Sequence, residues 1–321
     1  MRCLRRFAAA LLVLLGIGCV HAQQQFPAKP IRLLVPDRPG APLDIQARTL
    51  ARKLTERFEQ SVVVDNRPGG NYIIGTRIAI AANADGYTVI LVPSSYAANA
   101  AFYKLPYDPL NDVTPIARIG VSGFAVTLHP SHAVASIRDL IAYDKANPGQ
   151  LRYGTAGAGG GSHRAAELFN QMAGTNLVNV PYSDAGTVLG SLLGGQIQIV
   201  FGNLPTMIPQ IKSERLRGIA VTTARRSNAV PDIPTVAETL AGYEAVSWQG
   251  VLGPKGLPKD IVVRWNSEVN RIVQLPYVKD RLAALGIDAV DESPQQFHAF
   301  LEREIAKWQK VVKIANMKPE G

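Results

Sequence analysis

The feature that most constrains this chain is a glycine-rich turn between a short strand and a helix, within residues 151–169. The turn contains Gly154, Gly157, Gly159, Gly160 and Gly161, and glycine lets a backbone take turns that side chains would block. We expect the next residue, a serine at position 162, to cap the helix that follows. Such a junction directs unpaired N–H groups and the positive end of a helix dipole at one point, so the pattern predicts an anion-binding loop.

Two other interpretations of the turn need weighing. A glycine cluster is also typical of a plain flexible turn, and this alternative stays open. A dinucleotide-binding loop does not fit, because the spacing that starts at Gly157 and Gly159 has Ser162 in place of the last glycine.

The rest of the chain alternates strands with helices, which favours right-handed crossovers and mainly parallel sheets. A polar loop follows several strands, at residues 37–44, 93–96, 155–163, 182–186 and 202–203. We expect Asp44 to cap the helix of residues 45–58. The extended stretches 116–128 and 243–252 are predicted to carry the chain into a second unit and back. Ligands of open α/β sheets bind beyond the carboxyl ends of strands, so these loops are expected to surround one ligand.

This organisation predicts an α/β protein of two lobes, each a mixed sheet flanked by helices, with two crossing strands as the hinge. Lobe 1 is predicted to comprise residues 23–122 and 246–321, and lobe 2 residues 123–245. A chain of 321 residues is long enough to give each lobe its own core.

The N-terminus is typical of an export signal. Arg2, Arg5 and Arg6 precede an apolar run that is too short to span a bilayer comfortably. We expect residues 1–22 to be removed after Ala22, which places the mature protein in the periplasm. The alternative is a lipoprotein anchored through Cys19.

Removal of this segment has two consequences. The chain has 2 cysteines, and both lie in the signal, so disulfides, thiol nucleophiles and thiolate metal sites are excluded from the mature chain. The three arginines go as well, so the formal net charge falls from +9 to +6, with 31 basic residues against 25 acidic ones. The basic residues are scattered rather than clustered, so we expect no nucleic-acid binding.

Short motifs along the whole mature chain resemble the Bug family, the periplasmic solute-binding receptors of tripartite tricarboxylate transporters. The resemblance rests on FPAKPIRLLVP at 26–36, DNRPG at 65–69, ADGYT at 84–88, KLPYDP at 104–109, SH at 162–163, VPY at 180–182, LGGQ at 193–196, NLP at 203–205, PDIPTVAE at 231–238 and IAKW at 305–308.

The resemblance implies a type II-like periplasmic binding protein that closes on a small organic anion of the carboxylate type and delivers it to the membrane subunits of the transporter. It implies a binding protein without enzymatic activity, cofactor or metal, and we expect a monomer. Carried over to this chain, the family's ligand-binding loops correspond to Pro39, Gly40, Ala41, Asp44, Ser94, Ser95, Tyr96, Asn99, Thr155, Ala156, Gly157, Ser162, His163, Tyr182 and Asn203.

The chain departs from the family pattern in the first loop, at Gly202 and at residues 71–73, and each departure affects which acid is bound. One hypothesis is that Arg38 contacts a second acidic group of the ligand. The alternative is a surface ion pair between Asp37 and Arg38, worth ~0–1 kcal/mol.

Other classes of function fit less well. A secreted hydrolase would use Ser162 with His163, but adjacent residues of a helix point in different directions. The remaining histidines show no metal-ligand spacing. Trp248 and Trp308 are expected in the core. A ligand-sensing subunit of a signalling system would use the same closed lobes, so the sequence does not separate that role from transport.

Overall fold

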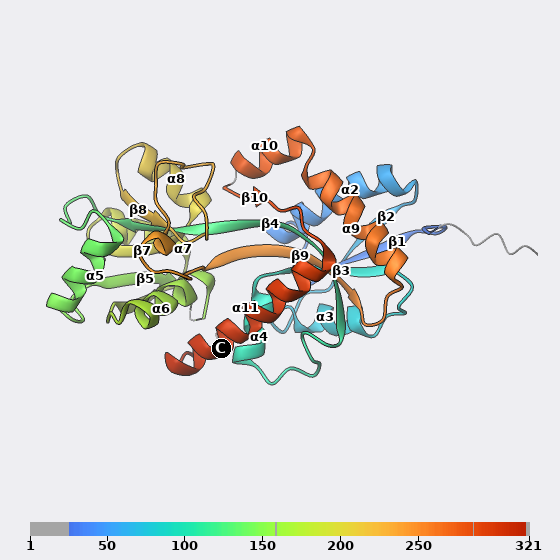
Figure 1. Ribbon diagram of the computed structural model, residues 1–321, viewed down its shortest axis with the longest axis horizontal. Helices are drawn as coiled ribbons and strands as arrows, with labels where there is room; N and C mark the ends of the chain where they lie inside the picture. Colours follow the sequence, from blue (N-terminus) through green and yellow to red (C-terminus); the bar gives the residue numbers. More distant parts are fainter. Residues whose placement is uncertain (1–25, 158, 285, 319–321) are drawn as a thin grey trace, which may run out of the picture.

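The computed structural model describes residues 26–157, 159–284 and 286–318. The predicted signal peptide, including Cys19, lies outside the described residues. Two α/β halves sit at opposite ends of an elongated molecule, and long strands run between them (Figure 1). None of the helices among the described residues is long and apolar enough to cross a membrane.

The first half is built on a sheet that starts with three parallel strands. Strand β1 (Ile31–Val35) lies between β2 (Val62–Asn66) and β3 (Thr88–Pro93). Strand β9 (Val246–Pro254) then pairs antiparallel with β3.

The second half repeats this design. Strand β5 (Arg152–Ala156) is parallel to both β6 (Val178–Tyr182) and β7 (Ile199–Asn203). Strand β8 (Arg217–Val221) is antiparallel to β4 (Val113–Leu128). The parallel strands and their helical crossovers agree with the alternation in the sequence.

Strands β4 and β9 connect the halves. From Val113 to Gly123, β4 pairs antiparallel with β9, and from Phe124 to Leu128 it pairs with β7. The partners change at Gly123, where the sequence predicts that the chain passes from one lobe to the other. A Cβ at this position would lie 2.9 Å from the Thr223 side chain, so the crossing is closely packed.

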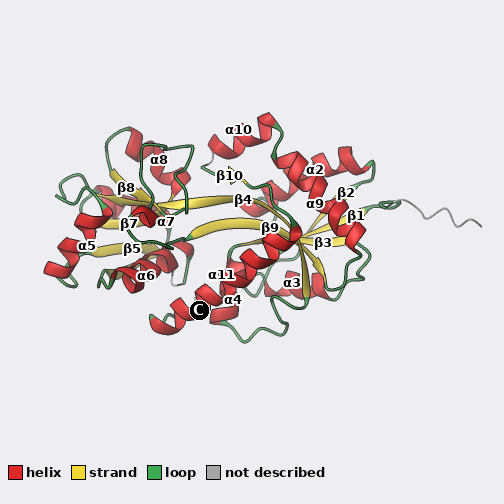
Figure 2. Ribbon diagram, viewed as in Figure 1, coloured by secondary structure: helices red, strands yellow, loops and turns green. Residues whose placement is uncertain are grey.

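Helices cover the sheets in both halves (Figure 2). Those of the first half are α2 (Pro42–Phe58), α3 (Ile73–Ile80), α4 (Ser95–Phe102) and α9 (Lys259–Val273). Those of the second half are α5 (Ile137–Ala146), α6 (Gly161–Ala173), α7 (Ala185–Leu193), α8 (Leu204–Lys212) and the short 3-10 helix η2 (Val236–Glu238). The chain ends with α10 (Pro276–Ala284), strand β10 (Asp288–Ala289) and α11 (Pro294–Ile314).

The alternation of side chains along the second part of β4 directs them into two different cores. Phe124 and Val126 belong to a large apolar cluster that includes residues of α6 and α11. Ala125 instead joins a cluster formed with residues of α7 and α8. A strand buried on both faces has a nearly continuous apolar sequence, and residues 124–128 of β4 fit this pattern except at Thr127.

Helix α11 packs on both halves, with contacts to α4 and α6. Its buried Glu304 accepts hydrogen bonds from the indole nitrogens of Trp248, at 3.3 Å, and Trp308, at 3.0 Å. Trp248 lies on β9 and Trp308 on α11, and the two side chains are 0% and 2% exposed. The prediction that both tryptophans belong to the core is confirmed.

Two predicted helix caps are wrong. Helix α2 begins earlier than expected, at Pro42, so Asp44 lies inside its first turn and Ala41 is the N-cap. Proline suits the first helical position because its missing N–H is not needed there. Helix α6 begins at Gly161 with Gly160 as the N-cap, so Ser162 is also an interior residue.

Candidate functional site: a cleft lined by helix N-termini

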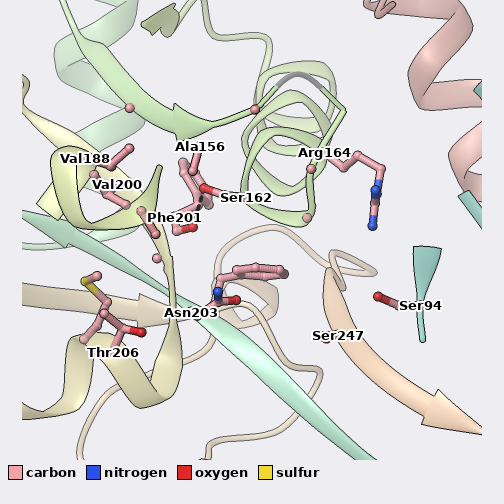
Figure 3. A pocket seen from close by; sticks show the side chains of 18 of the residues that line it. Ser94, Ala156, Ser162, Arg164, Val188, Val200, Phe201, Asn203, Thr206 and Ser247 are labelled. Atoms are coloured by element: carbon pink, nitrogen blue, oxygen red, sulfur yellow. Dashed lines mark hydrogen bonds between the residues drawn. The ribbon is translucent and has the colours of Figure 1, made fainter. Parts of the chain in front are cut away.

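A cavity of about 250 Å³ lies between the two halves. Figure 3 shows Ser94 and Ser247 on one side of it, with Ser162, Arg164 and Asn203 on elements of the second half. Its described lining comprises Pro93, Ser94, Ser95, Phe124, Gly154, Ala156, Gly157, Gly160, Gly161, Ser162, Arg164, Ala185, Val188, Val200, Phe201, Gly202, Asn203, Thr206, Met207 and Ser247.

Several helices begin at this cavity. Lining residues include Ser95 at the start of α4, Gly161 at the start of α6, Ala185 at the start of α7, and Asn203, the N-cap of α8. The N-caps of α4, α6 and α8 make no side-chain capping hydrogen bond. The first N–H groups of a helix have no partner within it, and together with the helix dipole they favour an anion.

The glycine turn shapes the wall from which α6 starts. Gly157 and Gly159 have φ angles of 91° and 77°, a left-handed conformation that favours glycine. Gly161 has a different reason to lack a side chain, because a Cβ there would lie 2.6 Å from Cζ of Phe124. The turn therefore brings the backbone of α6 against β4, at the floor of the cavity.

Arg164 supplies the positive charge of the cavity. Its side chain comes from the first turns of α6, and the residue is 4% exposed. The Nη1 atom donates a hydrogen bond of 2.6 Å to the carbonyl oxygen of Gly159, and the guanidinium lies over the ring of Trp308. Arg164 is the one charged side chain among the described residues that line the cavity.

Ser162 and His163 do not form a serine–histidine pair. The Ser162 hydroxyl donates to the carbonyl oxygen of Phe201 at 2.6 Å. The Nδ1 atom of His163 accepts the N–H of Gly159 at 3.0 Å, and its Nε2 lies 3.5 Å from the Asn179 amide. Burial and then the nearby Arg164 charge lower the pKa of His163 to about 4, so the ring is neutral near pH 7. This histidine holds the glycine turn in place.

Six of the residues predicted to bind ligand line the cavity together: Ser94, Ser95, Ala156, Gly157, Ser162 and Asn203. They come from loops far apart in the sequence, and the fold brings them together beyond the carboxyl ends of β3, β5 and β7. This is the position that the sequence predicts for the ligand.

The predicted residues of the first loop do not line the cavity. Arg38, Pro39 and Gly40 are exposed, and Ala41 is the N-cap of α2. The main-chain N–H of Arg38 donates to the Asp37 carboxylate at 2.8 Å. The ligand contact of Arg38 and its alternative, a side-chain ion pair with Asp37, both stay predictions.

Asp44, whose ligand contact also stays a prediction, organises this loop. Its buried carboxylate accepts hydrogen bonds from the Gly40 N–H at 2.8 Å, the Asn66 amide at 2.9 Å and Arg48 at 2.9 Å. The Arg48 hydrogen bond is the main reason why its pKa falls to about 2.

The remaining predicted residues are not among the described residues that line the cavity. The Tyr96 hydroxyl donates to Pro109 O at 2.7 Å, and the Asn99 amide donates to Asn71 O at 2.6 Å. Thr155 donates to Asn179 at 2.8 Å. Tyr182 is half-buried against the core of α7 and α8.

The most informative residue missed by the sequence reasoning is Arg164. A signal for it exists, because a cation in the first turns of a helix is disfavoured by the helix dipole and its presence there calls for an anionic partner. Ser247 and Phe124 were missed because they lie on the crossing strands, whose residues face the cavity only after the two halves are assembled. Within the described parts of the chain, no cluster of three or more His, Cys, Asp or Glu side chains could hold a metal ion.

Residues 46–317 match the model of the tripartite tricarboxylate transporter family receptor. The chain belongs to this family. It is 34% identical to protein BugT of Bordetella pertussis, over 94% of each chain. It is also 31% identical to the UPF0065 protein in the tcbD-tcbE intergenic region of Pseudomonas sp. strain P51, over 96% of this chain and 93% of that protein. The resemblance to the Bug family is therefore confirmed.

Solved structures of family members have the same fold. The R. palustris protein Rpa4515 with adipate is 34% identical, covers 92% of this chain and 99% of its own, and has a TM-score of 0.71. MatC from Rhodopseudomonas palustris with bound malate is 26% identical, with coverages of 89% and 100% and a TM-score of 0.67. A TctC solute binding protein from Polaromonas, without ligand, has a TM-score of 0.84 at 24% identity, with coverages of 90% and 99%. The predicted α/β periplasmic-binding-protein fold is confirmed.

Proposed function

We propose that this protein is a periplasmic receptor that captures a small carboxylate between its two halves and delivers it to the membrane subunits of a tripartite tricarboxylate transporter. The observation that carries the proposal is the convergence of uncapped helix N-termini and Arg164 on one cavity between the halves. Solved relatives with adipate and malate support a carboxylate as the ligand class.

The mechanism that fits this geometry is differential binding. Ser94, Ser95 and Ser247 approach the cavity from the first half and from β9, whereas Gly161, Ser162 and Asn203 belong to the second half or to its helices. A ligand that contacts both sets only when the halves close shifts the equilibrium toward the closed form. The closed form is then the state that a membrane partner recognises.

A panel of small carboxylates tests the binding step in the purified mature protein. We expect at least one acid to stabilise the protein by ~2.7 kcal/mol at a hundredfold excess over its Kd, seen as a rise in Tm. Replacing Ser162, which lines the cavity, with Ala should reduce the rise. Ser61→Ala, at an exposed position of the first half, is the matched control. An unchanged Tm with every acid would refute the proposal.

Two further measurements test delivery and the absence of turnover. Uptake of the labelled acid into vesicles that contain the large and small membrane subunits of a tripartite tricarboxylate transporter should require the receptor. A panel of esters and glycosides should be returned unchanged, because Ser162 lacks a histidine partner. Receptor-independent uptake would contradict the delivery role, and turnover would support a hydrolase instead.

A further inference from the structure

The cavity differs in character between its two ends. Figure 3 shows Arg164 and Ser94 toward one end and Val188, Val200 and Thr206 toward the other. The Arg164 end also receives the N-termini of α4 and α6 and the hydroxyls of Ser95 and Ser247.

The opposite end is formed mainly by apolar side chains. Val188 from α7, Val200 from β7 and Met207 from α8 are 5%, 2% and 3% exposed. Phe124 from β4 adds an aromatic ring to the same lining. These residues belong to packed apolar cores, so the wall is preformed rather than a set of mobile surface side chains.

The contact between Gly202 and Met207 makes this wall of the cavity apolar. A Cβ at position 202 would lie 2.6–2.8 Å from three side-chain atoms of Met207, so the methionine fills the space of a side chain at 202. The Met207 sulfur is held by the Thr127 hydroxyl at 3.6 Å. A thioether therefore occupies the space that a side chain at position 202 of β7 would take.

We propose that the receptor selects monocarboxylates with an apolar tail over dicarboxylates of the same length. This inference rests on the proposed function and specifies its ligand class. The carboxylate would lie at the Arg164 end, against the helix N-termini, and the tail against Val188, Val200 and Met207. A second carboxylate at this end would meet these apolar side chains and the starts of α7 and α8, without a described cation, so the loss of its water would be costly. The Arg38 hypothesis predicts the opposite preference.

The cavity size agrees with a small acid. At about 250 Å³ it lies close to the lower end of ligand-site volumes, ~300 Å³. A six-carbon chain or a single aromatic ring is the scale of tail that the four apolar residues can enclose.

Calorimetry with matched acids tests the proposal. Hexanoate and adipate have the same carbon count, and benzoate and terephthalate share a ring. We expect each monoacid to bind at least about tenfold more tightly than its diacid. Tighter binding of the diacids would overturn the proposal and favour Arg38 as a second anion contact. If none of the carboxylates in the wider panel bound, the proposed function itself would fail.

Two charge variants on the second half give a second test. Thr206 is exposed, lines the apolar end and is on α8, so Thr206→Arg places a cation there with little risk to folding. We expect this variant to bind adipate at least about tenfold more tightly than the unmodified protein. Ser213→Arg adds the same charge just after α8, outside the cavity lining, and should leave the hexanoate-to-adipate ratio unchanged. If both variants changed the hexanoate-to-adipate ratio by the same factor, the proposal would be contradicted.

Arg164 provides the final variant pair. Arg164→Gln should weaken hexanoate and adipate by a similar factor, because both acids place one carboxylate at this end, and Arg164→Lys should restore part of the affinity. A loss confined to adipate would mean that Arg164 holds the second carboxylate, which would overturn the assignment of the two ends. Circular dichroism and Tm establish that each variant is folded.

Discussion

The guanidinium of Arg164 lies over the indole ring of Trp308, with 5.1 Å between the guanidinium carbon and the ring centroid. Arg164 lines the cavity from α6, and Trp308 belongs to α11, which packs on both halves. The Gln171 amide of α6 also donates to Val311 O of α11 at 2.9 Å. The charge that lines the cavity is therefore positioned by the helix that bridges the two halves.

We expect Trp308→Leu to weaken carboxylate binding about 2- to 30-fold, which corresponds to the ~0.5–2 kcal/mol of a cation–π contact. Trp308→Phe keeps an aromatic face but loses the indole N–H that bonds to Glu304. It should lose less affinity than the leucine variant. Calorimetry well below each Tm measures the effect. Equal losses in the two variants would show that the hydrogen bond, rather than the ring, positions Arg164.

Alanine substitutions at two glycines should change stability in opposite directions. Gly161→Ala should lower Tm and weaken carboxylate binding, because its Cβ would lie 2.6 Å from the Phe124 ring at the floor of the cavity. Gly190 lies inside α7, and a Cβ added there would meet open space, so Gly190→Ala should stabilise the protein by ~0.5–1 kcal/mol. Denaturant unfolding measures both changes. A neutral Gly161→Ala would mean that Phe124 moves aside freely.

The sequence predicts the order of strands and helices well, because apolar periodicity and turn residues are local signals. Loops at the carboxyl ends of parallel strands meet at one edge, so the sequence also predicts that these loops surround one ligand. The resemblance to the Bug family then supplied the individual residues, six of which line the cavity. The predictions that Asp44 caps α2 and that Ser162 caps α6 were wrong. Helix α2 begins at Pro42 and helix α6 follows its N-cap Gly160, so each helix begins one turn or less before the expected cap.

The contributions of Ser247, Phe124 and Met207 could not be predicted from local patterns. Ser247 and Phe124 lie on strands whose cavity-facing side depends on the crossing of β4 and β9, and Met207 lies on α8. The pairing of Gly202 with Met207 likewise depends on tertiary packing, because it joins a strand to the following helix across a close contact.

His163 should make stability depend on pH. Its pKa falls from 6.5 in the unfolded chain to about 4 in the folded protein, mainly because of burial. Between these values the unfolded state binds the extra proton. The free energy of unfolding should therefore fall as the pH drops below 6.5 and level off below about 4, with a slope of at most ~1.4 kcal/mol per pH unit. Partial exposure of the ring reduces this slope.

The His163→Gln variant isolates this contribution. Its amide oxygen can accept the Gly159 N–H in place of Nδ1, and it carries no charge at any pH in this range. Urea titrations at several pH values measure the free energy of unfolding of the wild type and the variant. The difference between the two proteins at each pH removes the contribution of the Asp and Glu side chains, because both proteins share it. A difference between the two proteins that stays constant from pH 7 to 4 would contradict a neutral, buried His163.

The ion pair between Arg118 and Glu292 should be one of the largest side-chain contributions to stability. The Nε and Nη2 atoms of Arg118 donate to the two Glu292 oxygens at 2.9 and 2.8 Å, and the side chains are 13% and 9% exposed. The guanidinium also lies 3.8 Å from the centroid of the Phe300 ring. Removing one partner leaves the other charge buried, so we expect Arg118→Met to cost ~3–5 kcal/mol.

The double variant Arg118→Met with Glu292→Leu should recover much of that loss, because it leaves no buried charge without a partner. The pair formed by Arg226 and Glu238 is the control. It has similar geometry, at 2.9 Å, but its side chains are 47% and 46% exposed, so Arg226→Met should change stability little. Chemical unfolding of the four proteins measures the comparison. If Arg118→Met and Arg226→Met cost the same, burial does not set the strength of the Arg118 pair, and β4 is held to the start of α11 by packing alone.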